Sequence, residues 1–205
     1  MSFYGVAKAL CKVYYKILFR TEVEGLNNIP SGEDGFIVCA NHKSMNDPVL
    51  LAANLPIRFS YIAKEELFRF KPFAALIKSL GAIPIKRGTG DLGALKVALK
   101  VLKDNGKLVI FPEGTRSRHE YMNKGKGGAA LIAIKAKVKI VPIGIKGKYK
   151  PFSKIKINIG SPIELDEYYD KKVDSEALQK ITDEIIMPTV SELSGVPTYE
   201  NRNCG

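Results

Sequence analysis

Two residues that could perform acid–base chemistry, His42 and Asp47, lie five positions apart in the segment "ANHKSMNDPVL". His42 is one of two histidines in the chain, and it closely follows an apolar run, "FIVCA" at 36–40. A tight loop would bring Asp47 to one imidazole nitrogen, where a carboxylate fixes the tautomer and leaves the other nitrogen free as a base. The alternative is structural, because an Asp before a Pro is a common helix start.

A second polar segment, "FPEGTRSR" at 111–118, belongs to the end of another apolar run, "KLVIF". Gly114 permits a turn there, and Arg116 and Arg118 carry planar guanidinium groups that match phosphate oxygens. Glu113 could pair with an arginine or accept hydrogen bonds from substrate hydroxyls. The alternative is a solvated surface loop with a local ion pair.

Two further apolar segments are notable, one for the basic residues that follow it and one for a proline inside it. Lys86 and Arg87 end the extended segment "GAIPIKRG" at 81–88. Pro142 lies inside the apolar run "VPIGI", where a proline indicates a sheet edge or a bulge, and we interpret it as a strand-terminating residue. No serine or cysteine lies in a nucleophile-elbow pattern, and "GTGDLG" has the wrong glycine spacing for a dinucleotide loop.

The elements that must position these residues alternate along the chain. The predicted strands lie at 36–40, 59–63, 82–85, 107–111, 138–145 and 154–160. The predicted helices lie at 47–54, 65–80 with a bend or break near Pro72, 91–104, 127–137 and 174–194. Because the strands are continuous apolar runs, we predict an α/β fold with a mostly parallel central sheet covered by helices on both faces. Ligands bind such sheets at the C-terminal ends of the strands, where the polar segments lie.

Residues 1–20 are predicted to form an amphipathic helix. Its basic residues recur every four positions, at Lys8, Lys12, Lys16 and Arg20. Its apolar and aromatic residues fall on the other side, at Val6, Leu10, Val13, Tyr14, Ile17 and Leu18. This pattern is typical of a helix in an anionic lipid interface, and the alternative is a helix that docks on its own core with the lysines in solvent. We therefore predict an interfacial helix at 1–20 and one catalytic domain at 21–205.

Charge and cysteine usage narrow the possible partners and compartments. Lys and Arg number 32 against 21 Asp and Glu, which gives a net charge of +11 and favours anionic partners. Three cysteines without close pairing indicate a reducing compartment, and they lack the repeated spacing of a zinc site, so no metal is expected. No apolar stretch reaches about 18 residues, so we expect any membrane association to be interfacial.

In this order the segments resemble the motifs of the glycerolipid acyltransferases, specifically the 1-acylglycerol-3-phosphate (lysophosphatidate) acyltransferases. The matched residues are Asn41, His42 and Asp47; Gly81, Ile83 and Arg87 with the upstream Lys64; Phe111 to Ser117; and Val141 with Pro142. The third of these blocks, Phe-Pro-Glu-Gly-Thr-Arg-Ser, matches without departure. The resemblance covers residues 20–165, and four blocks in the family's order are far more specific than His-x4-Asp alone.

The resemblance implies transfer of a fatty acyl group from a thioester to the free 2-hydroxyl of the acceptor, giving phosphatidic acid. The donor would be acyl-coenzyme A or acyl carrier protein, with no other cofactor, and His42 and Asp47 would form the catalytic dyad. The residues implied to bind the acceptor are Lys64, Arg87, Glu113, Gly114, Thr115 and Arg116.

Members of this family associate with membranes, and many carry transmembrane segments, from which this chain departs. We expect a peripheral protein on the anionic cytoplasmic face of the cell membrane, with no nucleic-acid partner. Two alternatives stay open at this point. One is the same chemistry on glycerol-3-phosphate or another lysophospholipid, and the other is a non-enzymatic basic module that binds membrane or nucleic acid.

Overall fold

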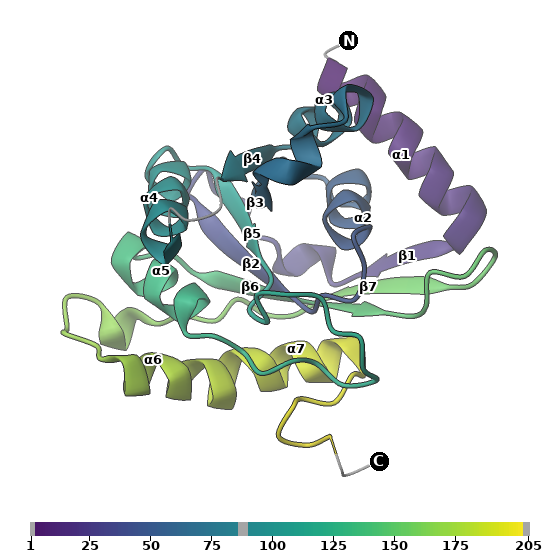
Figure 1. Ribbon diagram of the computed structural model, residues 1–205. Coiled ribbons are helices and arrows are strands. Elements are labelled where there is room, and N and C mark those ends of the chain that lie inside the picture. The colour runs from purple at the N-terminus through teal and green to yellow at the C-terminus, as the bar shows by residue number, and fades with distance from the viewer. Residues whose placement is uncertain (1–2, 86–89, 203–205) are drawn as a thin grey trace.

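A twisted seven-stranded sheet runs through the middle of the computed structural model, which describes residues 3–85 and 90–202 (Figure 1). The strands are β1 Thr21–Glu24, β2 Phe36–Ala40, β3 Phe59–Lys64, β4 Ala82–Ile85, β5 Lys107–Ile110, β6 Ile140–Lys146 and β7 Ile155–Ile159. Their order is β1-β7-β6-β2-β5-β3-β4, and every neighbouring pair is parallel except β6 with β7. The predicted mostly parallel α/β sheet is therefore confirmed.

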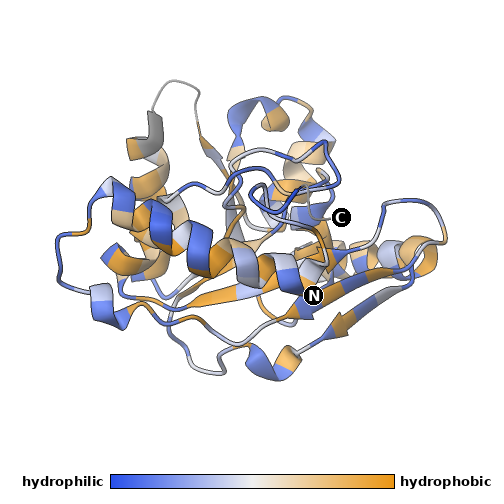
Figure 2. Cartoon of the chain, turned by 90° about the horizontal axis from the view of Figure 1, so that it is seen from below, coloured by the Kyte–Doolittle hydropathy of each residue, from blue (hydrophilic) through white to orange (hydrophobic). Residues whose placement is uncertain are grey.

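Helices cover both faces of this sheet. The α-helices are α1 Phe3–Phe19, α2 Asp47–Asn54, α3 Lys71–Ser79, α4 Gly90–Lys103, α5 Gly128–Ala136, α6 Ser175–Ile181 and α7 Met187–Ser194. Short 3-10 turns lie at Leu26–Asn28, Glu65–Phe68 and Asp166–Tyr168. The central strands are largely apolar, as the orange colour in Figure 2 shows.

The central strand β2 shows why the apolar runs are continuous. Phe36, Val38 and Ala40 join the core beneath α1 and α2 on one face, and Ile37 and Cys39 join the core beneath α4, α5 and α7 on the other. A parallel strand between two helical layers has no solvent face, so every side chain is apolar.

Strand β1 was not predicted, because it has only four residues, three of which are polar, and its side chains are alternately half-buried and exposed. It forms the edge of the sheet beside β7. Its carboxylates pair with lysines of the β7 segment: Glu22 with Lys154 at 2.7 Å and Glu24 with Lys156 at 2.8 Å. Charged residues of this kind suit an edge strand, where they discourage pairing with another chain.

The interpretation of Pro142 as a strand terminator is wrong, since it lies inside β6 opposite Cys39 of β2. The indication of a bulge is correct. Ile143 pairs with Ile159 and Ile140 with Ile163, so the partner segment has one extra residue in that interval. The carbonyl of Pro142 accepts a hydrogen bond from the N–H of Gly160 at 2.9 Å. The proline nitrogen faces the same side, where the bulge removes the need for a ladder donor.

The break predicted near Pro72 in the helix at 65–80 is confirmed. The segment is divided into a 3-10 turn and α3, which begins at Lys71 with Pro72 in its first turn. The helix predicted at 174–194 contains a π-helical turn, Thr182–Ile186, between α6 and α7. Pro188 follows at the start of α7, and its missing N–H and its ring are incompatible with a regular turn at that point.

Helix α1 has three distinct sides. It docks on the core of the domain and also exposes apolar residues, so features of both predicted alternatives, the docked helix and the interfacial helix, are present. One side docks on the domain and buries Ala7, Tyr15 and Phe19. The hydroxyl of Tyr15 donates to the carbonyl of Asn46 at 3.2 Å, and the ammonium of Lys8 donates to the carbonyl of Leu55 at 2.5 Å. The apolar residues predicted on the outer side are exposed and are described below, except Leu18, which is half-buried and packs against the core. Within the described residues, no helix is long and apolar enough to cross a membrane.

We predict that Gly144→Ala destabilises the fold by about 1–3 kcal/mol or more, because overpacking a rigid core costs free energy. A Cβ at Gly144 of β6 would lie 2.2 Å from the backbone of Leu193 and Ser194 in α7. Denaturant unfolding measures the change. Gly128→Ala is the matched control, since its Cβ would meet nothing within 4 Å at the start of α5. Equal stabilities for the two variants would contradict the close contact between β6 and α7.

Candidate active site

The predicted site residues that the structure describes gather at the C-terminal ends of the parallel strands. The loop after β2 carries His42 and Asp47, and the loop after the adjacent strand β5 carries the third motif, 111–117. The two loops are joined directly, because the N–H of Ser117 donates to the carbonyl of His42 at 2.8 Å. The topology thus brings together segments some seventy residues apart in the sequence, as the parallel arrangement predicted.

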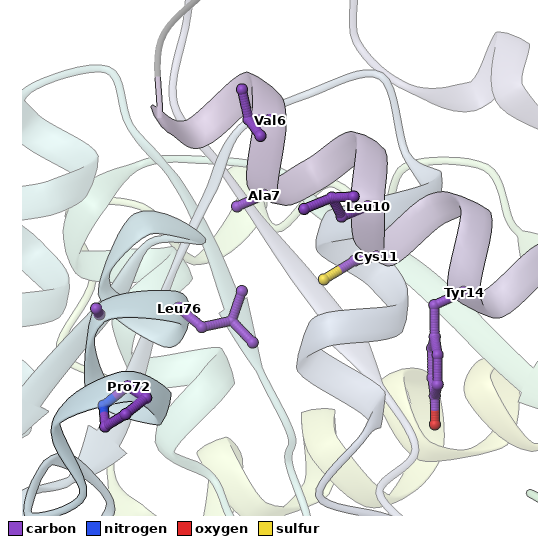
Figure 3. Close-up of a pocket in the computed structure, with 8 residues that line it drawn as sticks. Val6, Ala7, Leu10, Cys11, Tyr14, Pro72 and Leu76 are labelled. Atoms are coloured by element: carbon purple, nitrogen blue, oxygen red, sulfur yellow. The ribbon is translucent and has the colours of Figure 1, made fainter.

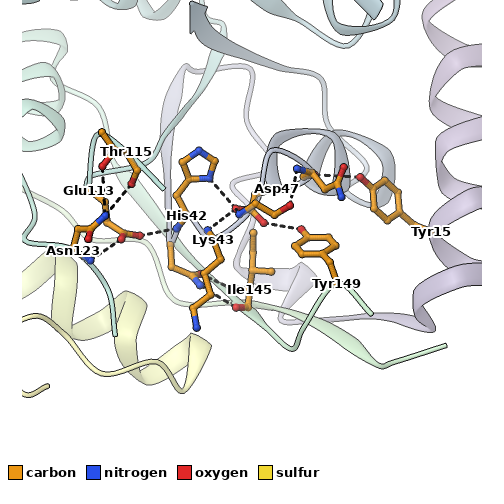
Figure 4. A network of polar contacts seen from close by, with 12 residues as sticks. Tyr15, His42, Lys43, Asp47, Glu113, Thr115, Asn123, Ile145 and Tyr149 are labelled. Atoms are coloured by element: carbon orange, nitrogen blue, oxygen red, sulfur yellow. Dashed lines mark hydrogen bonds and ion pairs between the residues drawn. The ribbon is translucent and has the colours of Figure 1, made fainter. Parts of the chain in front are cut away.

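His42 is fixed by its ring and by its backbone. Its Nδ1 lies 2.8 Å from Oδ2 of Asp47, and its ring stacks on Phe111 with centroids 4.0 Å apart. The side chain is 17% exposed, and no described residue hydrogen-bonds the other ring nitrogen, Nε2. That edge of the ring points away from the polar network (Figure 4). With a carboxylate at Nδ1 and a free Nε2, the imidazole has the geometry of a general base.

Asp47 is 1% exposed, and both of its carboxylate oxygens are occupied. Oδ2 accepts from His42 and from the backbone N–H groups of Lys43 at 2.8 Å and Ser44 at 2.7 Å. Oδ1 accepts from the hydroxyl of Tyr149 at 2.7 Å. Asp47 is the first residue of α2, but the N-cap is Asn46, and the carboxylate binds amides upstream of the helix. Its charge at the N-terminus is still favourable for the helix dipole, while its hydrogen bonds organise the loop.

Asn41 anchors the start of this loop to the neighbouring strand. Its side-chain amide donates to the carbonyl of Ile145 at 3.0 Å and accepts from the N–H of Ile145 at 2.7 Å. The amide thus continues the pairing of β2 with β6 beyond the last residue of β2. This contact fixes the position of the start of the loop relative to β6.

Glu113 is a second buried carboxylate, 2% exposed, and it joins the two loops. Oε1 accepts from the N–H of His42 and Oε2 from the N–H of Asn123, each at 2.7 Å. Burial raises the pKa of Glu113, and the two backbone hydrogen bonds oppose that rise. Its hydrogen-bond partners among the described residues are these amides. The ion pair with an arginine, which was the alternative interpretation of this loop, is not formed within that part of the chain.

The third motif continues in a tight, exposed turn. Gly114 has φ 71°, in the left-handed region that favours glycine, and its N–H donates to the carbonyl of Phe111 at 2.9 Å. Thr115 and Arg116 are exposed after it, and the described residues give Arg116 no ion pair. An unpaired guanidinium at this position is available for an anionic ligand.

The remaining predicted acceptor residues belong to the neighbouring strands. Lys64 is the exposed last residue of β3 and pairs with Ile85, the last residue of β4. Arg87, the candidate from the second motif, lies outside the described residues. Among the residues that are described, no cluster of three or more His, Cys, Asp or Glu side chains could hold a metal ion.

Sequence reasoning missed several residues that build this site. Tyr149 comes from the hairpin after β6, Asn123 from the loop after the third motif, and Tyr15 from α1. The segment "KGKYK" gave no signal, because a single tyrosine among lysines fits any surface hairpin. The amides that Asp47 and Glu113 bind are backbone groups, which carry no sequence signature.

Comparison with known proteins gives consistent matches. A family profile described as Acyltransferase matches residues 20–146. A 1-acyl-sn-glycerol-3-phosphate acyltransferase of Streptococcus pneumoniae is 34% identical over 78% of this chain and 61% of its own length. One from Bacillus subtilis is 30% identical over 74% of this chain and 78% of its own. The chain therefore spans less than two thirds of the first of these relatives.

A solved structure has the same fold. The crystal structure of the 1-acyl-sn-glycerophosphate (LPA) acyltransferase PlsC from Thermotoga maritima matches with a TM-score of 0.73 and 28% identity. The match covers 93% of this chain and 79% of that one, so it extends beyond the interval that the family profile matches.

We predict that Glu113→Gln destabilises the protein by about 1–3 kcal/mol, because an amide NH2 would face one of the two buried backbone donors. Denaturant unfolding measures the loss, and amide hydrogen exchange at His42 and Asn123 locates it. Glu120→Gln is the control, since Glu120 is 85% exposed and its ion pair with Lys148, at 3.6 Å, is long and solvent-exposed. If Glu113→Gln were as stable as Glu120→Gln, the proposed bracing of the two loops would be wrong.

Proposed function

This chain belongs to the acyltransferase family, and from that premise we propose that it transfers a fatty acyl group from a thioester to the 2-hydroxyl of 1-acylglycerol-3-phosphate, which gives phosphatidic acid. The relatives named above carry that activity in their names. The observation that carries the proposal is the His42–Asp47 contact of 2.8 Å, with Nε2 free beside the exposed third motif.

The mechanism follows from these contacts. Nε2 of His42 accepts the proton of the acceptor hydroxyl as the oxygen attacks the thioester carbonyl. The tetrahedral intermediate then collapses, the carbon–sulfur bond breaks, and the imidazolium returns the proton to the leaving thiolate. Asp47 keeps the tautomer with a proton on Nδ1 and stabilises the imidazolium. No acyl-enzyme is required, because the thioester is already activated.

The acceptor phosphate is proposed to bind Arg116 and Lys64, together with Arg87. Arg116 and Lys64 are exposed basic residues at the same sheet edge as His42. Guanidinium groups bind phosphate oxygens in pairs and so place the hydroxyl near the base. Gly114 and Thr115 complete the turn that carries Arg116. The two amide contacts of Glu113 favour a role in holding the loops rather than a direct contact with the acceptor.

The acyl donor is proposed to be acyl-coenzyme A or acyl carrier protein, with no further cofactor. Both donors are anionic, and both suit a chain of net charge +11. The tetrahedral oxyanion requires hydrogen-bond donors. The backbone N–H groups of Thr115 and Arg116 are candidates, because no described residue accepts a hydrogen bond from either.

Helix α1 is proposed to lie on the anionic cytoplasmic face of the membrane. Its solvent-facing apolar residues are all at least 42% exposed: Val6, Leu10, Val13, Tyr14 and Ile17. Lys12 and Lys16 are exposed beside them. Large exposed apolar side chains flanked by lysines are characteristic of interfacial helices.

An apolar cleft of about 380 Å³ between α1 and α3 extends this surface. Its lining includes Val6, Leu10 and Tyr14 of α1 and Pro72 and Leu76 of α3, and Leu76 projects toward α1 (Figure 3). None of the lining residues belongs to the proposed catalytic pair or to the third motif. The cleft therefore supports a lipid-facing role for this side of the molecule rather than a role in the chemistry.

We predict that His42→Ala lowers acyl transfer by about 10²- to 10⁴-fold, the usual loss on removing a general base. The assay follows release of free thiol from an acyl thioester, with and without 1-acylglycerol-3-phosphate. His119→Ala is the control, because His119 is the second histidine and is exposed. Retention of more than a few per cent of activity in His42→Ala would refute the dyad. Thiol release that ignores the acceptor would refute the reaction itself.

We predict that the double substitution Leu10→Ser with Ile17→Ser weakens binding to phosphatidylglycerol vesicles at least about tenfold, since two large apolar side chains would no longer be buried in lipid. The docked side of α1, with Tyr15 and Phe19, is left intact. Leu92→Ser is the matched control, because Leu92 is 71% exposed in α4, on the side of the molecule away from α1 (Figure 1). Vesicle sedimentation that is equal for both variants would exclude α1 as the lipid contact.

A further inference from the structure

Tyr149 contacts the proposed catalytic pair from outside every motif. It lies in the hairpin between β6 and β7, beyond residue 146, where the match to the family profile ends. Its hydroxyl donates to Oδ1 of Asp47 at 2.7 Å (Figure 4). The contact joins two residues 102 positions apart in the sequence.

The two carboxylate oxygens of Asp47 accept different numbers of hydrogen bonds. Oδ2 accepts three hydrogen bonds, from His42, Lys43 and Ser44, whereas Tyr149 is the only donor to Oδ1 among the described residues. A buried carboxylate oxygen without a donor carries a large desolvation penalty. The phenol therefore decides how the negative charge is shared between the two oxygens.

The phenol remains a donor over the working pH range of any such enzyme. Burial and the neighbouring negative charge of Asp47 raise the pKa of Tyr149 far above its ordinary value. The hydroxyl thus keeps its proton and can donate it to Oδ1 of Asp47.

The position of the Tyr149 ring is set by α1. The ring packs edge-on against Phe19, with centroids 5.6 Å apart and planes at 80°. The hairpin is also tied to the same helix, because the N–H of Phe152 donates to the carbonyl of Leu18 at 2.5 Å. Loss of the hydroxyl alone would leave these packing contacts in place.

We propose that Tyr149 is a positioning residue for the His42–Asp47 pair, holding the Asp47 carboxylate with Oδ2 toward the imidazole and moderating its negative charge. The proposal rests on the function proposed above, in which His42 is the base. Tyr149 acts through Asp47 and does not touch the reacting atoms. Its effect should therefore appear in the chemical step rather than in acceptor binding.

The test is Tyr149→Phe, which removes the hydroxyl and keeps the ring. We expect kcat to fall about tenfold, as for loss of a hydrogen bond to a buried charge, with KM for the acceptor unchanged. The acid limb of the kcat–pH profile should move to higher pH, because a carboxylate without its phenol attracts a proton on His42 more strongly. The NMR signal of the Nδ1 proton of His42 should shift as well, and His119→Ala identifies that signal.

The matched control is Tyr61→Phe. Tyr61 is also a buried tyrosine, but its hydroxyl has no hydrogen-bond partner in the described structure. We expect Tyr61→Phe to leave kcat, the pH profile and the Nδ1 signal at their wild-type values. In an Asp47→Asn background, Tyr149→Phe should cause no further loss, because its effect requires the carboxylate.

Several outcomes would overturn the proposal. They are an unchanged pH profile with an unchanged Nδ1 signal, a full further loss in the Asp47→Asn background, and failure of Tyr149→Phe to fold. The NMR comparison does not require turnover. A wild-type chain without acyltransferase activity would therefore refute the proposed function, while the shift of the Nδ1 signal would still report whether Tyr149 acts on the pair.

Discussion

The buried carboxylate of Asp47 is the constraint on which the arrangement of this site depends. An ionised group with 1% exposure is tolerated only where hydrogen bonds replace water, and four donors do so here. Those donors come from the loop after β2 and from the hairpin after β6. Each of these segments must therefore take one conformation. Because Asp47 contacts Nδ1 of His42, these segments also fix the orientation of the imidazole.

Glu113, on the other side of His42, is also a buried carboxylate that accepts hydrogen bonds from backbone amides. Its two oxygens bind backbone amides of two separate segments. A chain of net charge +11 could have compensated both buried carboxylates with lysine or arginine. Within the described residues the two carboxylates are held by backbone amides, a phenol and the imidazole of His42 instead. Exposed cations such as Arg116 and Lys64 are left available for an anionic ligand. The division is consistent with the proposed chemistry, in which one set of groups holds the base and another holds a phosphate.

Much of the fold was predictable because burial on two faces forces an unbroken apolar pattern, as in β2. The spacing of His42 and Asp47 was informative for a similar reason, since a short loop limits where the aspartate can reach. The edge strand β1 escaped prediction because half of its side chains face water. Pro142 was misinterpreted because the bulge that accommodates it is formed by a distant segment of the chain. Tyr149 was missed because a contact between segments 102 residues apart has no local pattern.

The family profile matches residues 20–146, yet α1 and the hairpin that carries Tyr149 lie on either side of that interval. A fragment cut to those limits would contain all four motif blocks. It would lack the phenol that completes the shell around Asp47 and the ring of Phe19 that holds the phenol in place. Two homologues could thus agree at every motif position and still differ in the basicity of the histidine. Some of the residues that surround the histidine–aspartate pair lie in the flanking sequence, outside the profile match.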